Sequence, residues 1–201
     1  METPAAPTNA AQNPDEIFDV VDEFDRVVGK ATRAETHRKK LFHRAVHVLV
    51  FDARGNVLLQ KRSLAKDTCP GLFSTSCAGH VDAGEDYAAA AERELREELG
   101  IAVPENFFGR GNARLLHLPP CEETGFEHVD VYGIGNYAGT LTPNPAEIES
   151  VRWASPDEVT RALAETPERF AESFRFVWER LCAPEIFGGT MRKISRVSFR
   201  T

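Results

Sequence analysis

The sequence predicts an α/β fold in which a mixed β-sheet lies between helices, an α/β/α sandwich with an N-terminal β-hairpin. Two observations predict this class. Short segments in which apolar, often β-branched residues alternate with polar ones recur along the chain, as is typical of strands. Segments with helical periodicity are interspersed, first at 86–99 and again in the last third of the chain. Strands mixed with two or three helices bury their apolar faces by packing in layers.

The strand segments are bounded by turn residues. Residues 16–33 contain two alternating runs on either side of EFDR, which predicts the hairpin. The turn ARGN at 53–56 separates two further strands, and Pro70 and Gly71 interrupt the chain before another. After the hairpin, the strands are expected at 45–52, 57–62, 72–79, 113–120, 128–139 and 151–155.

Capping residues mark the ends of the helices. Gly100 stands where the helix at 86–99 needs a C-cap. Residues 142–150 predict a loop, and after the last strand Ser155 and Pro156 predict the N-cap and first residue of a second helix. The segment 167–182, PERFAESFRFVWERLC, predicts an amphipathic third helix.

The chain of 201 residues is long enough for one domain with a substantial core. We assign residues 1–14 to a disordered tail, 15–183 to the domain and 184–201 to an extension without an assigned role. Hydrophobic residues make up 42% and charged residues 27%, as in ordinary globular proteins. The first fourteen residues lack the basic start and apolar core of a secretory signal.

Charge and cysteine usage exclude several classes of protein. The net charge is −7 and the pI about 5.4, and no basic patch indicates a nucleic-acid partner. No apolar run approaches the length of a membrane span. The four cysteines form no CxxC pair, which favours free thiols and a cytoplasmic location.

Residues 79–101 carry the main chemical signal. Gly79 is followed after five residues by Glu85, and after seven more by the run RELREELGI, which begins at Arg93. Within that run Glu94, Glu97 and Glu98 stand at i, i+3 and i+4, so a helix places them on one face. Their mutual repulsion would be relieved by a divalent cation, and Mg²⁺ prefers such oxygen ligands. The alternative is a solvated acidic helix face balanced by the neighbouring arginines.

This pattern resembles the signature of the Nudix hydrolases without a departure. The resemblance implies the Nudix sandwich fold and a Mg²⁺-dependent enzyme, with Mn²⁺ as a substitute, that cleaves a diphosphate linkage. It also implies that Glu94, Glu97 and Glu98 bind the metal together with the carbonyl oxygen of Ala78. By the same resemblance Glu85 and Arg93 form an ion pair that orients the glutamates. A further glutamate from outside the signature, matched here by Glu147, would act as base or ligand, and Glu98 is the other candidate base.

The flanking segments resemble the branch of the family related to isopentenyl-diphosphate isomerase. The likeness covers about residues 17–160. It implies a second metal site at the matching positions His37, His43, His80 and Glu127, whereas a structural role is the alternative for each histidine. A second isomerase glutamate falls on Val129, so that metal site is incomplete here. Two departures favour hydrolysis over isomerisation: the isomerase cysteine falls on Ala78, with Cys77 one residue earlier, and the signature is intact here, whereas the isomerases tend to have a degraded one.

The sequence therefore predicts a Nudix hydrolase that acts on a small-molecule diphosphate, a nucleoside diphosphate derivative or a related compound. The first alternative is an isopentenyl-diphosphate isomerase. An alternative of another class is a sensor with the Nudix fold that binds a ligand without turnover, although a sensor has little need of an intact metal-binding face. Trp153, Phe107 and Phe108 are candidates for stacking on a nucleobase, or for ordinary packing. The oligomeric state is open, a homodimer included.

Overall fold

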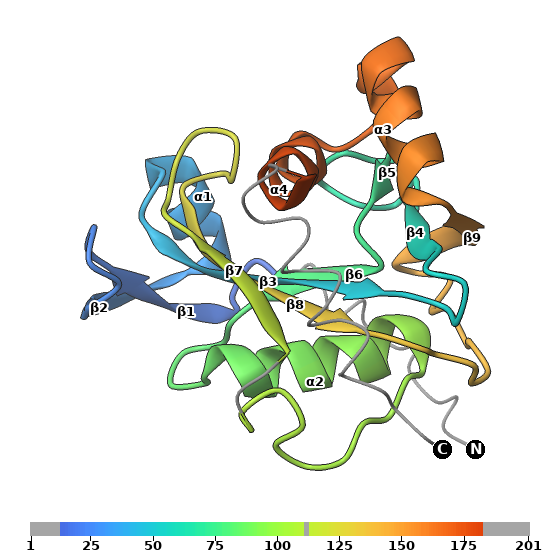
Figure 1. Cartoon of the computed structure of the whole chain (residues 1–201). Coiled ribbons are helices and arrows are strands. Elements are labelled where there is room, and N and C mark those ends of the chain that lie inside the picture. Colours follow the sequence, from blue (N-terminus) through green and yellow to red (C-terminus); the bar gives the residue numbers. More distant parts are fainter. Residues whose placement is uncertain (1–12, 111–112, 183–201) are drawn as a thin grey trace, which may run out of the picture.

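A four-stranded mixed sheet in the order β6-β3-β8-β7 lies between helix α2 on one face and helix α4 on the other (Figure 1). The computed structural model describes residues 13–110 and 113–182. The predicted α/β sandwich is confirmed, and one short helix is added to the predicted elements. The elements are β1 (Ile17–Val21), β2 (Val27–Thr32), α1 (Arg33–Lys39), β3 (His43–Val50), β4 (Val57–Arg62), β5 (Phe73–Ser74), β6 (Cys77–His80), α2 (Tyr87–Leu99), β7 (Arg114–Leu118), β8 (Glu127–Ile134), β9 (Ile148–Ala154), α3 (Pro156–Glu165), the 3₁₀ turn η2 (Pro167–Arg169) and α4 (Glu172–Cys182).

The alternation of side chains along β3 produces the two layers of core. Successive residues of a strand point to opposite faces of its sheet. The even-numbered valines of β3 belong to one apolar core with Leu95 and Leu99 of α2. Ala45 and Leu49 belong to the other core, together with Phe174 of α4. Because both faces are covered, β3 is nearly continuous in its burial. It pairs in parallel with β8 and antiparallel with β6.

The predicted single strand at 72–79 is wrong, because two buried hydroxyl groups interrupt it. Its first part, β5, joins a separate three-stranded sheet in the order β5-β4-β9, and its second part, β6, joins the four-stranded sheet. Ser76 Oγ donates to the carbonyl of Leu58 in β4 at 2.6 Å and accepts from the amide of Val50 in β3 at 2.8 Å. Thr75 Oγ1 donates to the carbonyl of Cys77 at 3.1 Å. These side-chain bonds replace ladder bonds and direct the chain from one sheet to the other.

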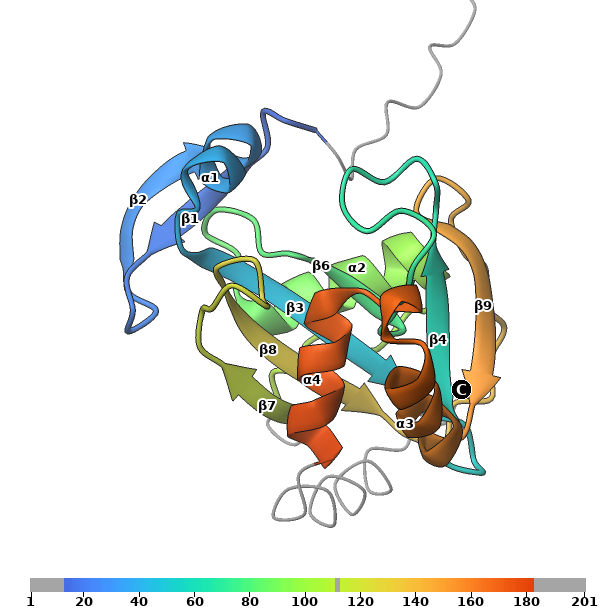
Figure 2. The same ribbon diagram turned by 90° about the horizontal axis from the view of Figure 1, so that it is seen from above.

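The hairpin of β1 and β2 forms as predicted and lies beside α1 at one end of the molecule (Figure 2). Helix α1 was not predicted, because seven mostly polar residues carry little periodicity. Thr32 caps its N-terminus by accepting from the amide of Glu35, and Lys40 ends it in the left-handed conformation with a φ of 54°. The helix places His37 against β3 and β6, beside His43 and His80.

The other differences are local. The segment 167–182 is not one helix, because Phe170 is extended and the amide of Ala171 bonds to the carbonyl of Phe73. Strand β9 begins at Ile148, within the predicted loop. Ser155 caps α3 with a reciprocal bond to Glu158, as its sequence indicated. Of the segments expected outside the domain, residues 1–12 and 184–201 lie outside the described residues.

Helix α2 has defined ends. Asp86 caps its N-terminus by accepting from the amide of Ala89 at 2.8 Å. Gly100 is the C-cap, as predicted, with a φ of 68° and its amide directed at the carbonyls of Arg96 and Leu95. A Cβ atom at Gly100 would lie 2.9 Å from the Cβ atom of Thr142. Both the conformation and the close approach therefore require glycine.

We expect Gly100→Ala to lower the free energy of unfolding by at least about 1 kcal/mol, since a left-handed residue with a Cβ atom costs about 1–2 kcal/mol. Urea denaturation at pH 7.5 measures the change. Gly29→Ala is the matched control, because a Cβ atom there meets nothing within 4 Å. Equal stability of the two variants would contradict this account of the C-cap.

Candidate active site

A cavity of about 550 Å³ collects the acidic face of α2, the ends of β3 and β6, and side chains from the segments around the three-stranded sheet. Glu94, Glu97 and Glu98 all line it. Glu98 is buried, with 3% of its surface exposed, whereas the side chain of Glu97 is 53% exposed and stands at the rim. The helix thus brings the three predicted carboxylates together, and two of them face the interior.

Arg93 joins the loop before α2, the helix and β6. Its guanidinium donates to Glu85 at 2.9 and 3.1 Å, to Glu94 at 2.6 Å and to the carbonyl of His80 at 2.9 Å. Glu85 can reach Arg93 because it precedes Asp86, the residue that caps the helix. Burial opposes the charge of Arg93, but the bonds to Glu85 and the charge of Glu94 outweigh it, and the pKa of Arg93 is raised. The guanidinium therefore stays charged and fixes the position of Glu94.

The two inner glutamates carry more negative charge than their protein surroundings balance. Burial, followed by repulsion from Glu98, raises the pKa of Glu94 to about 8, although Arg93 opposes the rise. Burial also raises the pKa of Glu98, where Lys66 opposes the rise and Glu147 adds to it. Desolvation penalises the charged form of a carboxyl group, and neighbouring carboxylates add to that penalty. A divalent cation at this position would remove it.

Glu147 lies in the same cavity, directly before β9, and is 3% exposed. Its Oε2 atom accepts from the ammonium group of Lys66, whereas Oε1 is buried without a hydrogen-bond partner among the described residues. Buried carboxylate oxygens are normally satisfied by donors or metals. The unsatisfied oxygen and the buried carboxyls of α2 together fit a hard divalent ion such as Mg²⁺ or Mn²⁺.

The segment before the helix leaves room for these carboxylates. A Cβ atom at Gly79 would lie 2.1 Å from Oε1 of Glu94, so only glycine allows this side chain its position. The amide of Ala78 is 3.4 Å from Oε2 of Glu98, and Nε2 of Gln60 donates to the same oxygen at 3.0 Å. Glu98 is thus held from two sides, by β4 and by β6.

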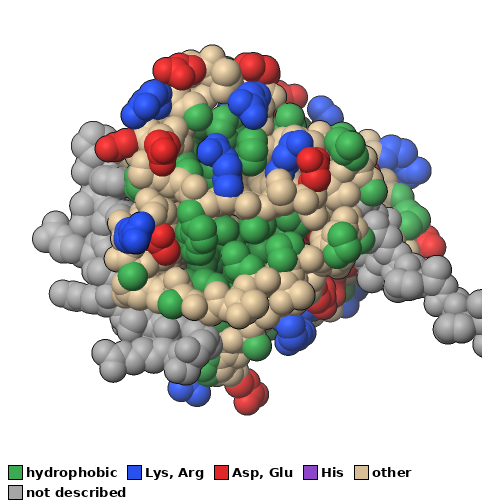
Figure 3. All heavy atoms as spheres, turned by 90° about the vertical axis from the view of Figure 1, so that its right-hand side faces the viewer, with side chains coloured by type: hydrophobic (Ala, Val, Ile, Leu, Met, Phe, Trp, Pro, Cys, Tyr) green, Lys and Arg blue, Asp and Glu red, His purple; other side chains and the backbone are tan. Residues whose placement is uncertain are grey.

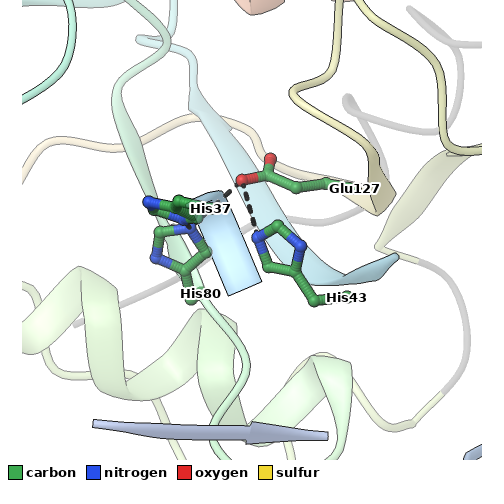
Figure 4. Close-up of side chains that lie close together, drawn as sticks. All are labelled: His37, His43, His80 and Glu127. Carbon is green, nitrogen blue, oxygen red and sulfur yellow. Dashed lines mark hydrogen bonds and ion pairs between the residues drawn. The ribbon is translucent and has the colours of Figure 1, made fainter. Parts of the chain in front are cut away.

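A second group of ligand-type side chains adjoins the acidic face (Figure 4). One side-chain atom from each of four residues lies within 4.8 Å of the others; the residues are His37, His43, His80 and Glu127. Oε1 of Glu127 is 3.1 Å from Nε2 of His80 and 3.4 Å from Nε2 of His43. The structure therefore brings together the four residues that the isomerase resemblance indicated.

Hydrogen-bond partners determine which of these nitrogens is free. Nδ1 of His43 lies 2.9 Å from the carbonyl of Leu41, which can only accept, so Nε2 has the lone pair and is without a hydrogen-bond partner. Arg33 donates to Nδ1 of His80 at 2.9 Å, which leaves the proton of a neutral ring on Nε2, beside Glu127. His43 and Glu127 thus face each other ready for a cation, whereas His80 acts as a donor to Glu127.

Electrostatics in this group favour an ionised glutamate beside a neutral His80. Burial lowers the pKa of His80 to about 4. Burial opposes ionisation of Glu127 as well, but contacts with the histidines around its carboxyl group outweigh it and keep the pKa of Glu127 well below its usual range. A carboxylate together with imidazoles is a donor set that suits Mn²⁺ or Zn²⁺.

The remaining candidates from the sequence occupy other places. Cys77 is fully buried in the core beneath α2, and burial raises the pKa of its thiol. Phe107 and Phe108 pack against each other with ring centroids 5.1 Å apart. Trp153 is 38% exposed on β9, and Figure 3 shows hydrophobic side chains gathered on the side of the molecule where β4 and β9 lie. None of these aromatic side chains is among the residues that line the cavity.

The sequence analysis did not identify several side chains that contact the predicted residues. They are Gln60, which donates to Glu98, Lys66, which contacts Glu147, and Arg33, which donates to His80. No spacing rule relates them to the α2 signature, because β4, the following loop and α1 carry them.

The fold and the cavity lined by buried carboxylates are those of a protein that could hold a divalent cation, and comparison with known proteins identifies the family. The NUDIX domain family matches residues 41–174. The chain belongs to this family. The match, together with the Nudix hydrolases among its relatives, supports its classification as an enzyme, a pyrophosphohydrolase.

The chain is similar over most of its length to proteins named as isopentenyl-diphosphate isomerases and to a protein named as a Nudix hydrolase. An isopentenyl-diphosphate Delta-isomerase from Nocardia farcinica is 39% identical over 76% of this chain and 86% of the relative. One from Serratia proteamaculans is 31% identical over 86% and 94%. An uncharacterized Nudix hydrolase from Yersinia pestis is 33% identical over 78% and 85%.

Solved structures agree on the fold. A crystal structure of a Deinococcus radiodurans protein superposes with a TM-score of 0.70 at 24% identity, covering 84% of this chain and all of the other. A MutT protein from Methanosarcina mazei superposes with a TM-score of 0.55 at 22% identity, over 69% and 91%. Among the described residues, no helix has the length and apolar character needed to cross a membrane.

We expect His47→Gln to reduce the acid sensitivity of the protein. His47 is buried on β3 with Nδ1 3.0 Å from Oγ1 of Thr75, and burial lowers its pKa from 6.5 to about 4. A neutral buried histidine contributes stability above pH 6.5 that is lost as the pH falls towards 4, because only the unfolded chain then takes up the proton. Over that range the wild type should lose up to roughly 3 kcal/mol more than the variant.

Urea denaturation at several pH values between 4 and 8 measures this difference. The two proteins are compared by the change of unfolding free energy with pH, so a constant offset from the substitution does not matter. Parallel curves for wild type and His47→Gln would show that His47 does not contribute to the acid sensitivity.

Proposed function

We propose that the chain is a metal-dependent hydrolase that cleaves a diphosphate linkage in a nucleoside diphosphate derivative or a related small molecule. The observation that carries the proposal is the convergence of three buried or half-buried carboxylates, Glu94, Glu98 and Glu147, in one cavity. The cation-bearing side chains Arg62 and Lys66 line the same cavity, where they would face an anionic substrate. A metal-bound diphosphate satisfies both sets of charges.

The residues have distinct roles in this proposal. Glu94, Glu97 and Glu98, with the carbonyl oxygen of Ala78, would hold Mg²⁺ or Mn²⁺. The bound ion would neutralise charge on the phosphates and lower the pKa of a water molecule. Glu98 or Glu147 would accept the proton from the attacking water, since both carboxyl groups are buried in the cavity beside the proposed metal position.

Arg93 and Glu85 are positioning residues. Glu85 and Glu94 accept hydrogen bonds from the same guanidinium, so a change at Glu85 alters the position of Glu94 without contact with the substrate. The low solvent exposure of Glu98 and Glu147 also strengthens the electrostatic interactions of the site.

The second candidate function is isomerisation of isopentenyl diphosphate. The group of His37, His43, His80 and Glu127 favours it, together with the names of the relatives. Two positions argue against it. Ala78, at the place of the isomerase cysteine, has no proton to exchange, and Cys77 points into the core on the opposite face of β6.

We expect Glu98→Gln to lower kcat for diphosphate hydrolysis by at least about a hundredfold, because it removes a metal-ligating charge. The fold should stay intact, since removal of a buried charge stabilises the metal-free protein. The measurement is phosphate release with Mg²⁺ or Mn²⁺ on a panel of nucleotide sugars, dinucleotides, nucleoside triphosphates and prenyl diphosphates.

Glu149→Gln is the control, because Glu149 pairs with Lys61 on the surface. EDTA should abolish turnover of the wild type. Full activity of Glu98→Gln at saturating Mg²⁺ would refute the mechanism. Absence of release from every compound, with metal-dependent ligand binding intact, would favour the sensor.

We expect the wild type not to isomerise isopentenyl diphosphate at a useful rate. We also expect Cys77→Ala to change the rate of hydrolysis only as far as the loss of core packing lowers stability. The thiol is buried and its pKa is raised, so it is poorly suited to proton transfer. An isomerase assay with deuterated water detects exchange at the substrate. Robust isomerisation that vanishes in Cys77→Ala would establish the second candidate function in place of the first.

A further inference from the structure

The buried ion pair of Lys66 and Glu147 is not explained by the proposed chemistry alone. The side chains are 8% and 3% exposed, and the ammonium group contacts Oε2 of Glu147. Backbone bonds hold the two residues in register: the amide of Lys66 donates to the carbonyl of Ser63 at 3.2 Å, and the amide of Ser63 donates to the carbonyl of Glu147 at 2.9 Å. The pair is therefore built into the loop after β4.

A buried ion pair is an uncertain source of stability, because desolvation of the two charges offsets their attraction. The pair lies near Glu98. Lys66 favours the charged form of the Glu98 carboxyl group, whereas Glu147 disfavours it. Arg93 already accompanies Glu94 and Glu85. Lys66 thus contacts Glu147 directly and, together with Arg62, offsets the charge of Glu98.

We propose that Lys66 is an internal counter-ion that competes with the divalent cation for Glu147 and so sets the affinity of the site for metal. The inference rests on the proposed function and goes beyond it. When the cation is absent, the ammonium group balances Glu147. When the cation is held by Glu98 and its neighbours, two positive groups face the same carboxylates, and the ammonium group must leave Glu147.

The competition has a direct thermodynamic consequence. A ligand's affinity is reduced by whatever occupies its binding group in the free protein. Removal of the Lys66 charge leaves Glu147 without a counter-ion, so the site gains more from binding a divalent ion. We expect Lys66→Met to bind Mn²⁺ at least ~10-fold more tightly. Tenfold is about 1.4 kcal/mol, which is less than the repulsion between a unit charge and a nearby divalent ion at a partly buried site.

The experiment is calorimetric titration of Mn²⁺ at pH 7.5 without substrate. Mn²⁺ binding that is present in the wild type and absent in Glu98→Gln is assigned to the carboxylate site. Binding that remains in Glu98→Gln is assigned to the histidine group. Lys61→Met is the matched control, because Lys61 of β4 pairs at 2.7 Å with Glu149 of the neighbouring strand β9 and neither residue lines the cavity. Its affinity should equal that of the wild type, and the effect of Lys66→Met should shrink in a Glu147→Gln background.

Unchanged or weaker Glu98-dependent binding in Lys66→Met would overturn the inference and leave the proposed function standing. Absence of any Glu98-dependent binding in the wild type would overturn both. If Lys66→Met does not fold, the ammonium signal of Lys66 in wild-type NMR spectra decides. It should be protected from exchange in metal-free protein and lose that protection on addition of Mg²⁺, whereas persistence at saturating Mg²⁺ would refute the competition.

Discussion

The cavity depends on one electrostatic constraint: more carboxylates are buried in it than nearby cations can balance. Arg93 forms ion pairs with Glu85 and Glu94, and Lys66 forms one with Glu147. Glu98 accepts hydrogen bonds from the amides of Gln60 and Ala78, and it has no direct ion pair among the described residues, although Lys66 and Arg62 lie near enough to favour its charge. Such an excess is costly in a folded protein unless a ligand completes it. The surrounding structure is rigid enough to keep the carboxylates in place because α2 packs through Leu95 and Leu99 against β3.

Two donor sets of different chemistry adjoin in the same cavity. The α2 side offers oxygens alone, and the α1 side offers imidazoles around Glu127. Hard ions prefer the first set and borderline ions the second. His80 connects the two sets, because its carbonyl accepts from Arg93 while its ring bonds to Glu127. A change in the position of His80 would therefore be felt by both sets of ligands.

The sequence was informative where the structure is determined locally. Helix α2, its glycine C-cap and its face of glutamates follow from spacing within one segment, and the ion pair of Glu85 and Arg93 is present in the structure. The break at Ser76 could not be foreseen, because its hydroxyl group bonds to strands that are distant in the chain. Lys66 and Gln60 were missed for the same reason. The positions of these residues depend on tertiary contacts, which no local sequence pattern reveals.

Ser76 also bears on how the molecule can move. The two sheets share no paired strands, and the Ser76 hydroxyl bonds to one strand of each. Glu94 and Glu98 belong to α2, which packs on the four-stranded sheet. Glu147 and Lys66 lie next to the strands of the three-stranded sheet. Any displacement of one sheet against the other would change the separation of Glu98 and Glu147 and would also stretch the two Ser76 hydrogen bonds. The Ser76 hydroxyl therefore restrains the distance between these two carboxylates.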